Sequence, residues 1–349
     1  MGEKTYIPDK LFEFSTKVFQ KLGMTQEDSD TVCRILIKTD LRGISSHGVA
    51  RIPIYAKRIK LGLINPTPQI KILKENDTSA LIDADNGMGH IASEKAINIC
   101  IEKAKKSGMA AVGVRNSNHF GINAYYSMKA AEEGLIGMTF TNTSPLMAPF
   151  GGRERLLGSN PLCIAIPAGE EPDIVLDMAT SVVARGKLEV AARKGMNIPE
   201  GWAIDSEGRV TVDPQKALEG ALLPFGGPKG YGLAVLVDIL SGVLTGAKFG
   251  PDAGSLFGDL DRPQEIGHFF MAVSVENFMS LETFKHRMDS MIQRIRNSKK
   301  AEGVDRIYMP GEIEYLKSKE LIEKGITVNE KVIKELNDLA ENLGISDRL

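Results

Sequence analysis

Short apolar runs alternate with longer amphipathic stretches through the first half of the chain, and this alternation limits the possible folds more than any other feature. Helical periodicity covers residues 91–106 and 123–133. Strands interleaved with helices predict an α/β protein. Some connections are too short for a crossover helix, so a mixed sheet is expected. The apolar runs typical of buried strands cover residues 69–73, 80–84, 110–114, 136–141, 162–166 and 174–176.

Helices are expected at both ends of the chain. Apolar residues recur at helical spacing over 11–22, Gly23 is a stop signal, and Thr25 can cap a second helix. No proline- or serine-rich linker separates two halves. The later segments are a long apolar helix, a buried strand, a surface helix and a charged, mostly helical tail, over 230–244, 269–275, 281–296 and 312–349.

The composition excludes several classes of protein. The 43 basic and 45 acidic residues nearly balance, and no basic block indicates nucleic-acid binding. No apolar run reaches the length of a membrane span, and the first residues contain no apolar signal region. Three cysteines without a Cys-x-x-Cys pair favour reduced thiols, and the histidines lack metal-ligand spacing. We therefore expect a cytoplasmic protein without a metal site that binds neither nucleic acid nor membrane.

Three polar side chains, His47, Arg51 and Tyr55, are spaced four residues apart. On a helix they would lie on one face, with Ser45 or Ser46 as the cap. A guanidinium binds a carboxylate through two hydrogen bonds, and an imidazole can move a proton, so the set suits a small hydroxy or keto acid. Because Pro53 disfavours helical angles before it, the helix could begin after His47. A solvated helix start without function would show the same spacing.

A second histidine, His119, follows a predicted strand in a polar loop, where α/β proteins place ligands. By contrast, the Gly-x-Gly-x-x-Ala pattern at 87–92 does not define a dinucleotide site. The strand after it ends in Arg115 and Asn116 and offers no carboxylate for a ribose. We interpret these glycines as a turn into a helix.

Glycine-rich loops supply a different candidate for phosphate binding. Residues 224–232 read PFGGPKGYG and run into the long apolar helix, so backbone N–H groups and Lys229 could cradle a phosphate. Glycine loops without this function are equally common. Residues 177–181 likewise end a strand and begin a helix.

Five motifs, in this order along the chain, together resemble the type-2 malate/L-lactate dehydrogenase family. The resemblance implies an α/β fold that is not a Rossmann fold, a malate/L-sulfolactate dehydrogenase-like fold with an inserted cofactor domain. It divides the chain into a helical N-terminus and substrate domain at 1–122, a cofactor domain at 123–300, and a returning segment at 301–349. Members are usually homodimers. The motifs are GISSHG at 43–48, NHFG at 118–121, GSNP at 158–161, DMATS at 177–181 and GPKGYG at 227–232.

The resemblance also implies roles for individual residues. His47 and His119 correspond to the catalytic histidines, and Ser46, Arg51 and Tyr55 to residues that line the substrate pocket. Contacts to the dinucleotide are implied for Thr143, Asp177, Met178, Ala179, Lys229, Gly311 and Glu312.

The chain is therefore expected to be an NAD(P)-dependent dehydrogenase of a small L-2-hydroxy acid, malate or a lactate-like acid. NAD is the expected cofactor and NADP is possible. Ureidoglycolate dehydrogenase shares all the motifs, and a catalytically silent ligand-binding protein on the same scaffold is the rival from another class. Either histidine could carry the proton. His47 is favoured as the proton carrier, because a group near Arg51 is also near the carboxylate that Arg51 would bind.

Overall fold

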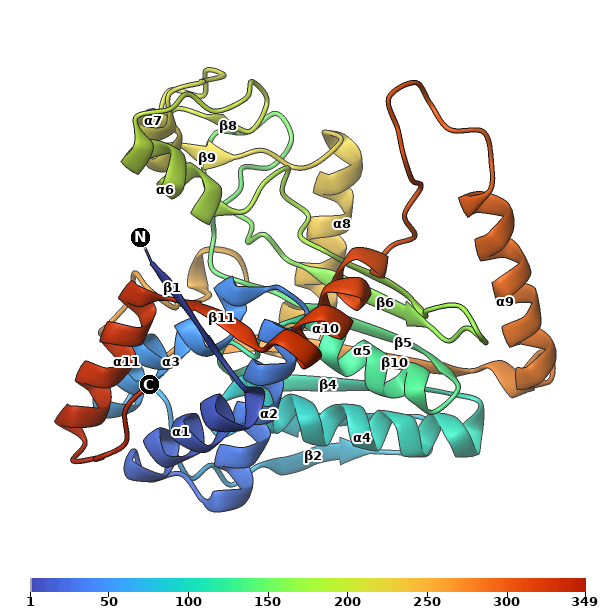
Figure 1. Ribbon diagram of the computed structural model, residues 1–349, viewed down its shortest axis with the longest axis horizontal. Coiled ribbons are helices and arrows are strands. Elements are labelled where there is room, and N and C mark those ends of the chain that lie inside the picture. The colour runs from blue at the N-terminus through green and yellow to red at the C-terminus, as the bar shows by residue number, and fades with distance from the viewer. Residues whose placement is uncertain (1) are drawn as a thin grey trace.

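The computed structural model describes residues 2–349, and its centre is a mixed seven-stranded sheet (Figure 1). The strand order is β2-β3-β4-β10-β5-β6-β7. These strands cover Lys71–Glu75 (β2), Ser79–Asp83 (β3), Met109–Ser117 (β4), Leu135–Thr141 (β5), Leu162–Ile166 (β6), Ile174–Met178 (β7) and Ile266–Ser274 (β10).

Four strands of this sheet end at one edge. β3 is parallel to β4, and β10 is antiparallel to both β4 and β5. β6 is antiparallel to both β5 and β7. Consequently β3, β4, β5 and β7 all point the same way, and the predicted mixed sheet is confirmed. We call the edge where these four strands end the carboxyl edge, the place where open α/β sheets bind ligands.

Helices cover both faces of the sheet. α4 (Gly89–Ser107) and α5 (Asn123–Glu132) pack on one face, and α8 (Pro228–Asp238) with its π-helical continuation η3 (Ile239–Val243) packs on the other. Adjacent residues of β10 point to opposite faces, as period-two alternation requires. Phe270 belongs to the core under α4 and α5, whereas Phe269 packs with Val237 of α8. The central strands are therefore buried on both sides.

A second core joins the two ends of the chain. It contains α1 (Pro8–Lys21), α2 (Gln26–Leu41), α3 (Ile52–Lys60) and α11 (Glu330–Asn342). β1 (Glu3–Tyr6) pairs antiparallel with β11 (Ile326–Asn329), and both termini lie on this side of the molecule (Figure 1). The predicted Thr25 cap is confirmed, because its hydroxyl accepts the N–H of Asp28 at 3.1 Å.

A smaller lobe lies above the sheet in Figure 1. It contains α6 (Arg185–Lys194), α7 (Pro214–Glu219) and the two-residue strands β8 (Ala203–Ile204) and β9 (Ala221–Leu222), around its own apolar cluster. The remaining helices are α9 (Leu281–Arg296) and α10 (Glu312–Lys324). The central sheet contains strands from both sides of residue 122. The three-part domain division remains a prediction. Within residues 2–349, every helix is too short or too polar to cross a membrane.

Candidate active site

Three of the predicted site residues meet at the carboxyl edge. Tyr55, buried on α3, places its hydroxyl 2.6 Å from Nδ1 of His119, which follows the end of β4. The imidazole of His47 stacks on that of His119, with ring centroids 5.5 Å apart and planes 24° apart. Segments 64 residues apart in the chain thus build one polar cluster.

The local structure around His47 differs from the predicted helix. His47 ends a 3₁₀ turn, Arg51 ends a second one at Val49–Arg51, and α3 begins only at Ile52. Pro53 occupies the first turn of α3, where its missing N–H costs nothing, and Ile52 before it is already helical, with φ −55° and ψ −44°. The single-helix arrangement is therefore wrong, although Pro53 correctly indicated a later start.

The predicted serine cap is also wrong. No side chain caps α3, and Ser46 Oγ instead lies 2.9 Å from Nδ1 of His47. A serine hydroxyl can donate or accept, so this contact orients the imidazole in either tautomer.

One residue that the sequence did not single out supports the backbone turn that follows His47. Asp40, buried near the end of α2, accepts the N–H of Val49 at 2.8 Å. A Cβ on Gly48 would come within 2.0 Å of the same carboxylate, so a side chain there would displace Asp40. Burial raises the pKa of Asp40 to about 7. Its position just before the GISSHG motif was the only signal in the sequence.

Arg51 lies beside the histidines with its guanidinium 4.7 Å from the ring centre of Phe257. Its buried Nε has no hydrogen-bond partner within residues 2–349. Burial lowers the pKa of Arg51, and the charge of Glu189 on α6 opposes that shift. A buried guanidinium nitrogen without a partner favours a bound anion, and a carboxylate is its natural ligand.

The electrostatics keep both imidazoles neutral. Burial, reinforced by the charge of Arg51, lowers the pKa of His47 to about 4. Burial, reinforced by the neighbouring imidazole of His47 and the charge of Arg51, holds the pKa of His119 well below its ordinary value. Burial raises the pKa of Tyr55 well above its ordinary value, so its hydroxyl stays protonated. The N–H of Gly121 also points at Nδ1 of His119, at 3.4 Å. With two donors on Nδ1, the ring proton of His119 lies on Nε2.

The candidate cofactor loops are joined at the GSNP motif. The Asn160 side chain accepts the N–H of Thr143 at 3.1 Å and donates to the carbonyl of Ala234 on α8 at 3.0 Å. The carbonyl of Ser159 accepts both the N–H and the hydroxyl of Thr180, at 2.8 and 2.9 Å. Two residues thus hold together the end of β5, the DMATS motif and α8.

Asp177, at the end of β7, connects these loops to the histidines. Its carboxylate accepts the N–H of Ala124 at 2.9 Å, in the first turn of the helix that follows the His119 loop. Burial raises the pKa of Asp177 to about 6, while that N–H and the charge of Arg42 oppose the shift. Met178 and Ala179 follow it, both half-buried.

Gly311 and Glu312 lie on the other side of β7. The carbonyl of Pro310 accepts the N–H of Val175 at 2.9 Å, and a Cβ on Gly311 would come within 2.7 Å of the Val175 side chain. Glu312 is buried. Its carboxylate accepts the N–H of Met309 at 2.9 Å and pairs with Arg296 and Arg306. The Glu312 side chain is therefore occupied within the protein and fixes the loop that presents Gly311.

Lys229 lies in the first turn of α8 and is exposed. Gly226 and Gly227 precede it with φ of 57° and 63°, values that favour glycine. The N–H of Phe225 donates to the carbonyl of Thr180 at 3.1 Å, which keeps this loop beside the DMATS motif. The predicted glycine turn into a helix is confirmed.

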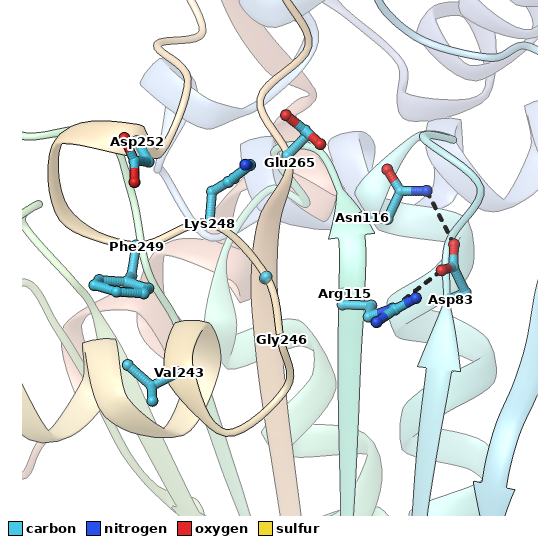
Figure 2. Close-up of a pocket in the computed structure, with 10 residues that line it drawn as sticks. Asp83, Arg115, Asn116, Val243, Gly246, Lys248, Phe249, Asp252 and Glu265 are labelled. Carbon is cyan, nitrogen blue, oxygen red and sulfur yellow. Dashed lines mark hydrogen bonds and ion pairs between the residues drawn. The ribbon is translucent and has the colours of Figure 1, made fainter.

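An open hollow of about 640 Å³ lies at the β3 and β4 end of the carboxyl edge (Figure 2). Figure 2 shows the carboxylate of Asp83 bonded to Arg115 and Asn116, at 3.1 and 3.0 Å. Lys248 and Glu265 also line it, whereas none of the predicted site residues does. The charged groups at its β3 and β4 side thus pair with one another. The Gly-x-Gly-x-x-Ala pattern at 87–92 lies near this end. It forms a turn into a helix, as predicted, since α4 begins at Gly89.

The fold and the site together describe an α/β protein with a buried guanidinium beside two neutral histidines. A family model described as malate/L-lactate dehydrogenase matches residues 7–337. The chain belongs to this malate/L-lactate dehydrogenase family, and the predicted fold and enzyme class are confirmed: it is a 2-hydroxy acid dehydrogenase.

Individual relatives agree over nearly the whole length. The chain is 46% identical to the malate dehydrogenase of Pyrococcus abyssi over 361 aligned positions, which cover 99% of each protein. It is 35% identical to the ureidoglycolate dehydrogenase (NAD(+)) of Escherichia coli K12, over 90% of this chain and 89% of that one. The solved sulfolactate dehydrogenase of Methanocaldococcus jannaschii superposes with a TM-score of 0.93 at 42% identity, over 98% of each chain.

Proposed function

We propose that the protein transfers a hydride between NAD and a small L-2-hydroxy acid, malate or a lactate-like acid. The observation that carries this proposal is the unpartnered Nε of Arg51 beside two stacked, neutral histidines. The names of the relatives support it, since they include malate and sulfolactate dehydrogenases. Ureidoglycolate is the alternative substrate, because the E. coli relative carries that activity in its name.

The loops fit a nicotinamide dinucleotide. Gly158 and Gly311 let these loops pack closely on one another, because a Cβ at either position would come within 2.3 Å of Thr143 or 2.7 Å of Val175. The residues that would hold the dinucleotide are Thr143, Asp177, Met178, Ala179 and Lys229, with Gly311 positioned by Glu312. Bound there, the nicotinamide supplies or accepts the hydride. NAD is the proposed form and NADP the alternative. The location remains a proposal as well: the cytoplasm, from the cysteine content.

Each polar side chain then has a task. Arg51 binds the substrate carboxylate and fixes the orientation of C2. His119, with Nδ1 held by Tyr55, donates its Nε2–H to the oxygen on C2. His47, oriented by Ser46, takes the hydroxyl proton during oxidation and returns it during reduction. A silent binding protein would have no need of this complete set.

The direct test is reduction of a panel of 2-keto acids: oxaloacetate, pyruvate, phenylpyruvate, sulfopyruvate and oxalurate. Each is combined with NADH and with NADPH, and the oxidised cofactor is followed by absorbance. Activity with oxaloacetate or pyruvate supports the proposal, and preference for oxalurate supports the ureidoglycolate alternative. No reduction of any acid with either cofactor would overturn the dehydrogenase assignment.

Lys229→Ala is expected to weaken cofactor binding more than it slows turnover of the bound enzyme. A charge-assisted hydrogen bond to a phosphate contributes about 1.5–3 kcal/mol, or roughly ten- to a hundred-fold in affinity. Calorimetric titration of NADH measures it. Lys334→Ala, an exposed lysine on α11, is the matched control. Equal affinities of the Lys229 variant and the native protein would contradict the assignment.

We also propose a homodimer, as the family resemblance implies. Its interface is supported by a row of exposed apolar side chains on the outer face of α8 and η3: Leu236, Ile239 and Val243 are 46%, 46% and 53% exposed. Their spacing of three and four residues places them on one face. Ile239→Glu is expected to shift the protein from dimer to monomer in sedimentation at micromolar concentration. A native protein that sediments only as an active monomer would refute the assembly.

A further inference from the structure

One arginine outside the predicted site fastens a whole segment of backbone. Arg58 is fully buried on α3, one helical turn beyond Tyr55. Its guanidinium donates hydrogen bonds, at 2.5 to 3.4 Å, to carbonyl groups that all belong to residues 254–264, the segment before β10. These are the carbonyls of Ser255, Leu256, Asp259 and Arg262.

The arrangement depends on the shape of the guanidinium. The carboxylate of Asp259 is engaged elsewhere, by the N–H of Ser255 at 2.9 Å and the guanidinium of Arg262 at 3.0 Å. The hydrogen bonds of Arg58 therefore go to backbone carbonyls, while the Asp259 carboxylate acts on its charge without a hydrogen bond. A planar guanidinium holds its N–H donors in fixed directions over a wide fork, whereas an ammonium group is a compact charge with three rotatable donors.

The same segment contacts two residues of the proposed active site. Phe257 lies over the Arg51 guanidinium, at 4.7 Å. The Gln264 side chain accepts the backbone N–H of His119 at 3.0 Å and donates to the carbonyl of Gly254 at 3.3 Å. The N–H of Gly254 in turn donates to the carbonyl of Gln264 at 2.9 Å, which closes the segment into a loop.

We propose that residues 254–264 form the roof of the substrate pocket, with Phe257 as a specificity residue and Arg58 and Gln264 as positioning residues. The inference rests on the proposed function of Arg51. The Arg51 guanidinium lies over the Phe257 ring, and its buried Nε has no hydrogen-bond partner within residues 2–349, so this N–H is free for the substrate carboxylate. The substituent on C3 of that substrate then extends beneath the roof, and the Phe257 ring limits its size.

The specificity role is tested with Phe257→Ala. The side chain is 55% exposed, so the variant keeps its core, and Phe278→Ala, 77% exposed, is the matched control. The ratio of kcat/KM for phenylpyruvate to that for pyruvate is expected to rise roughly ten-fold or more, within the range that pocket size differences supply. An unchanged ratio in Phe257→Ala would contradict the proposal that Phe257 limits the size of the substrate.

The positioning role is tested by hydrogen exchange, which does not depend on activity. Arg58→Lys is expected to speed amide exchange roughly ten-fold or more in peptides from 254–264 and to leave those of β5 and β6 unchanged. A second variant, Gln264→Met, removes the acceptor for the His119 amide and should speed exchange there. Native exchange rates in both variants would contradict the proposal that Arg58 and Gln264 hold residues 254–264 in place.

The two levels of the proposal can fail separately. Reduction of none of the 2-keto acids by the native protein means that the proposed function is wrong. Calorimetric titration of phenylpyruvate and pyruvate into the native protein and Phe257→Ala then gives the same size comparison through affinity, and the exchange measurement stands unaltered.

Discussion

His47→Ala is expected to lower kcat by about 10²- to 10⁴-fold, the usual cost of losing a general acid–base group. Its imidazole is held by Ser46, stacks on His119 and lies beside the proposed carboxylate site. The variant should also lose the acid limb of the pH profile for oxidation. Steady-state kinetics of the hydroxy acid across pH measures both quantities.

His119→Ala is the comparison that decides between the two histidines. Because Nδ1 of His119 already faces two donors, its expected part is to hold the oxygen on C2. Its loss should chiefly raise KM and leave the acid limb in place. If the limb survives in His47→Ala and disappears in His119→Ala, the roles are exchanged. If it survives in both, neither histidine carries the proton.

The pH at which the acid limb of the oxidation profile lies gives further information about His47. Oxidation needs a neutral imidazole, so its rate falls as the pH drops below the histidine pKa. Burial and Arg51 lower the pKa of His47 to about 4, so the limb of kcat/KM, which reports the free enzyme, should lie well below the ordinary 6.5. A bound carboxylate offsets the charge of Arg51. The limb of kcat should therefore lie at higher pH than that of kcat/KM.

Local pattern was enough to predict most elements. The apolar run at 162–166 is β6, and the amphipathic stretch at 281–296 is α9, each with the same boundaries. β10 was recognised as a buried strand, but its place between β4 and β5 could not be predicted, since the register joins residues more than a hundred positions apart. The short strands β1 and β11 lacked enough alternation to be recognised.

The candidate site shows the same difference between features that local sequence pattern reveals and features that depend on tertiary contacts. His47, Arg51, Tyr55 and His119 were found because their chemistry is unusual for their positions in the chain. Residues that act through backbone groups left no such signal. Asp40, Arg58 and Gln264 hold an N–H or a set of carbonyls, and any polar residue at those positions would look alike in the sequence. Their importance comes from tertiary contacts alone.

Arg51→Lys is expected to lower kcat/KM by about a hundred-fold although the charge is kept. A bidentate guanidinium–carboxylate pair contains two charge-assisted hydrogen bonds, each contributing about 1.5–3 kcal/mol, and an ammonium group cannot reproduce the geometry. Lysine can still approach the Phe257 ring as a cation, so that contact is partly retained. Arg287→Lys, an exposed arginine on α9, is the matched control.

An amide analogue of the substrate separates binding from structure. The native enzyme should use the amide poorly, because a neutral amide cannot accept both hydrogen bonds as a carboxylate does. The Arg51→Lys variant should lose little further with the amide, since the interaction that the mutation removes is already missing. Equal losses for acid and amide would mean that Arg51 supports the fold of the turn rather than the substrate. A loss confined to the acid would place the carboxylate at Arg51 and, with it, C2 beside the two histidines.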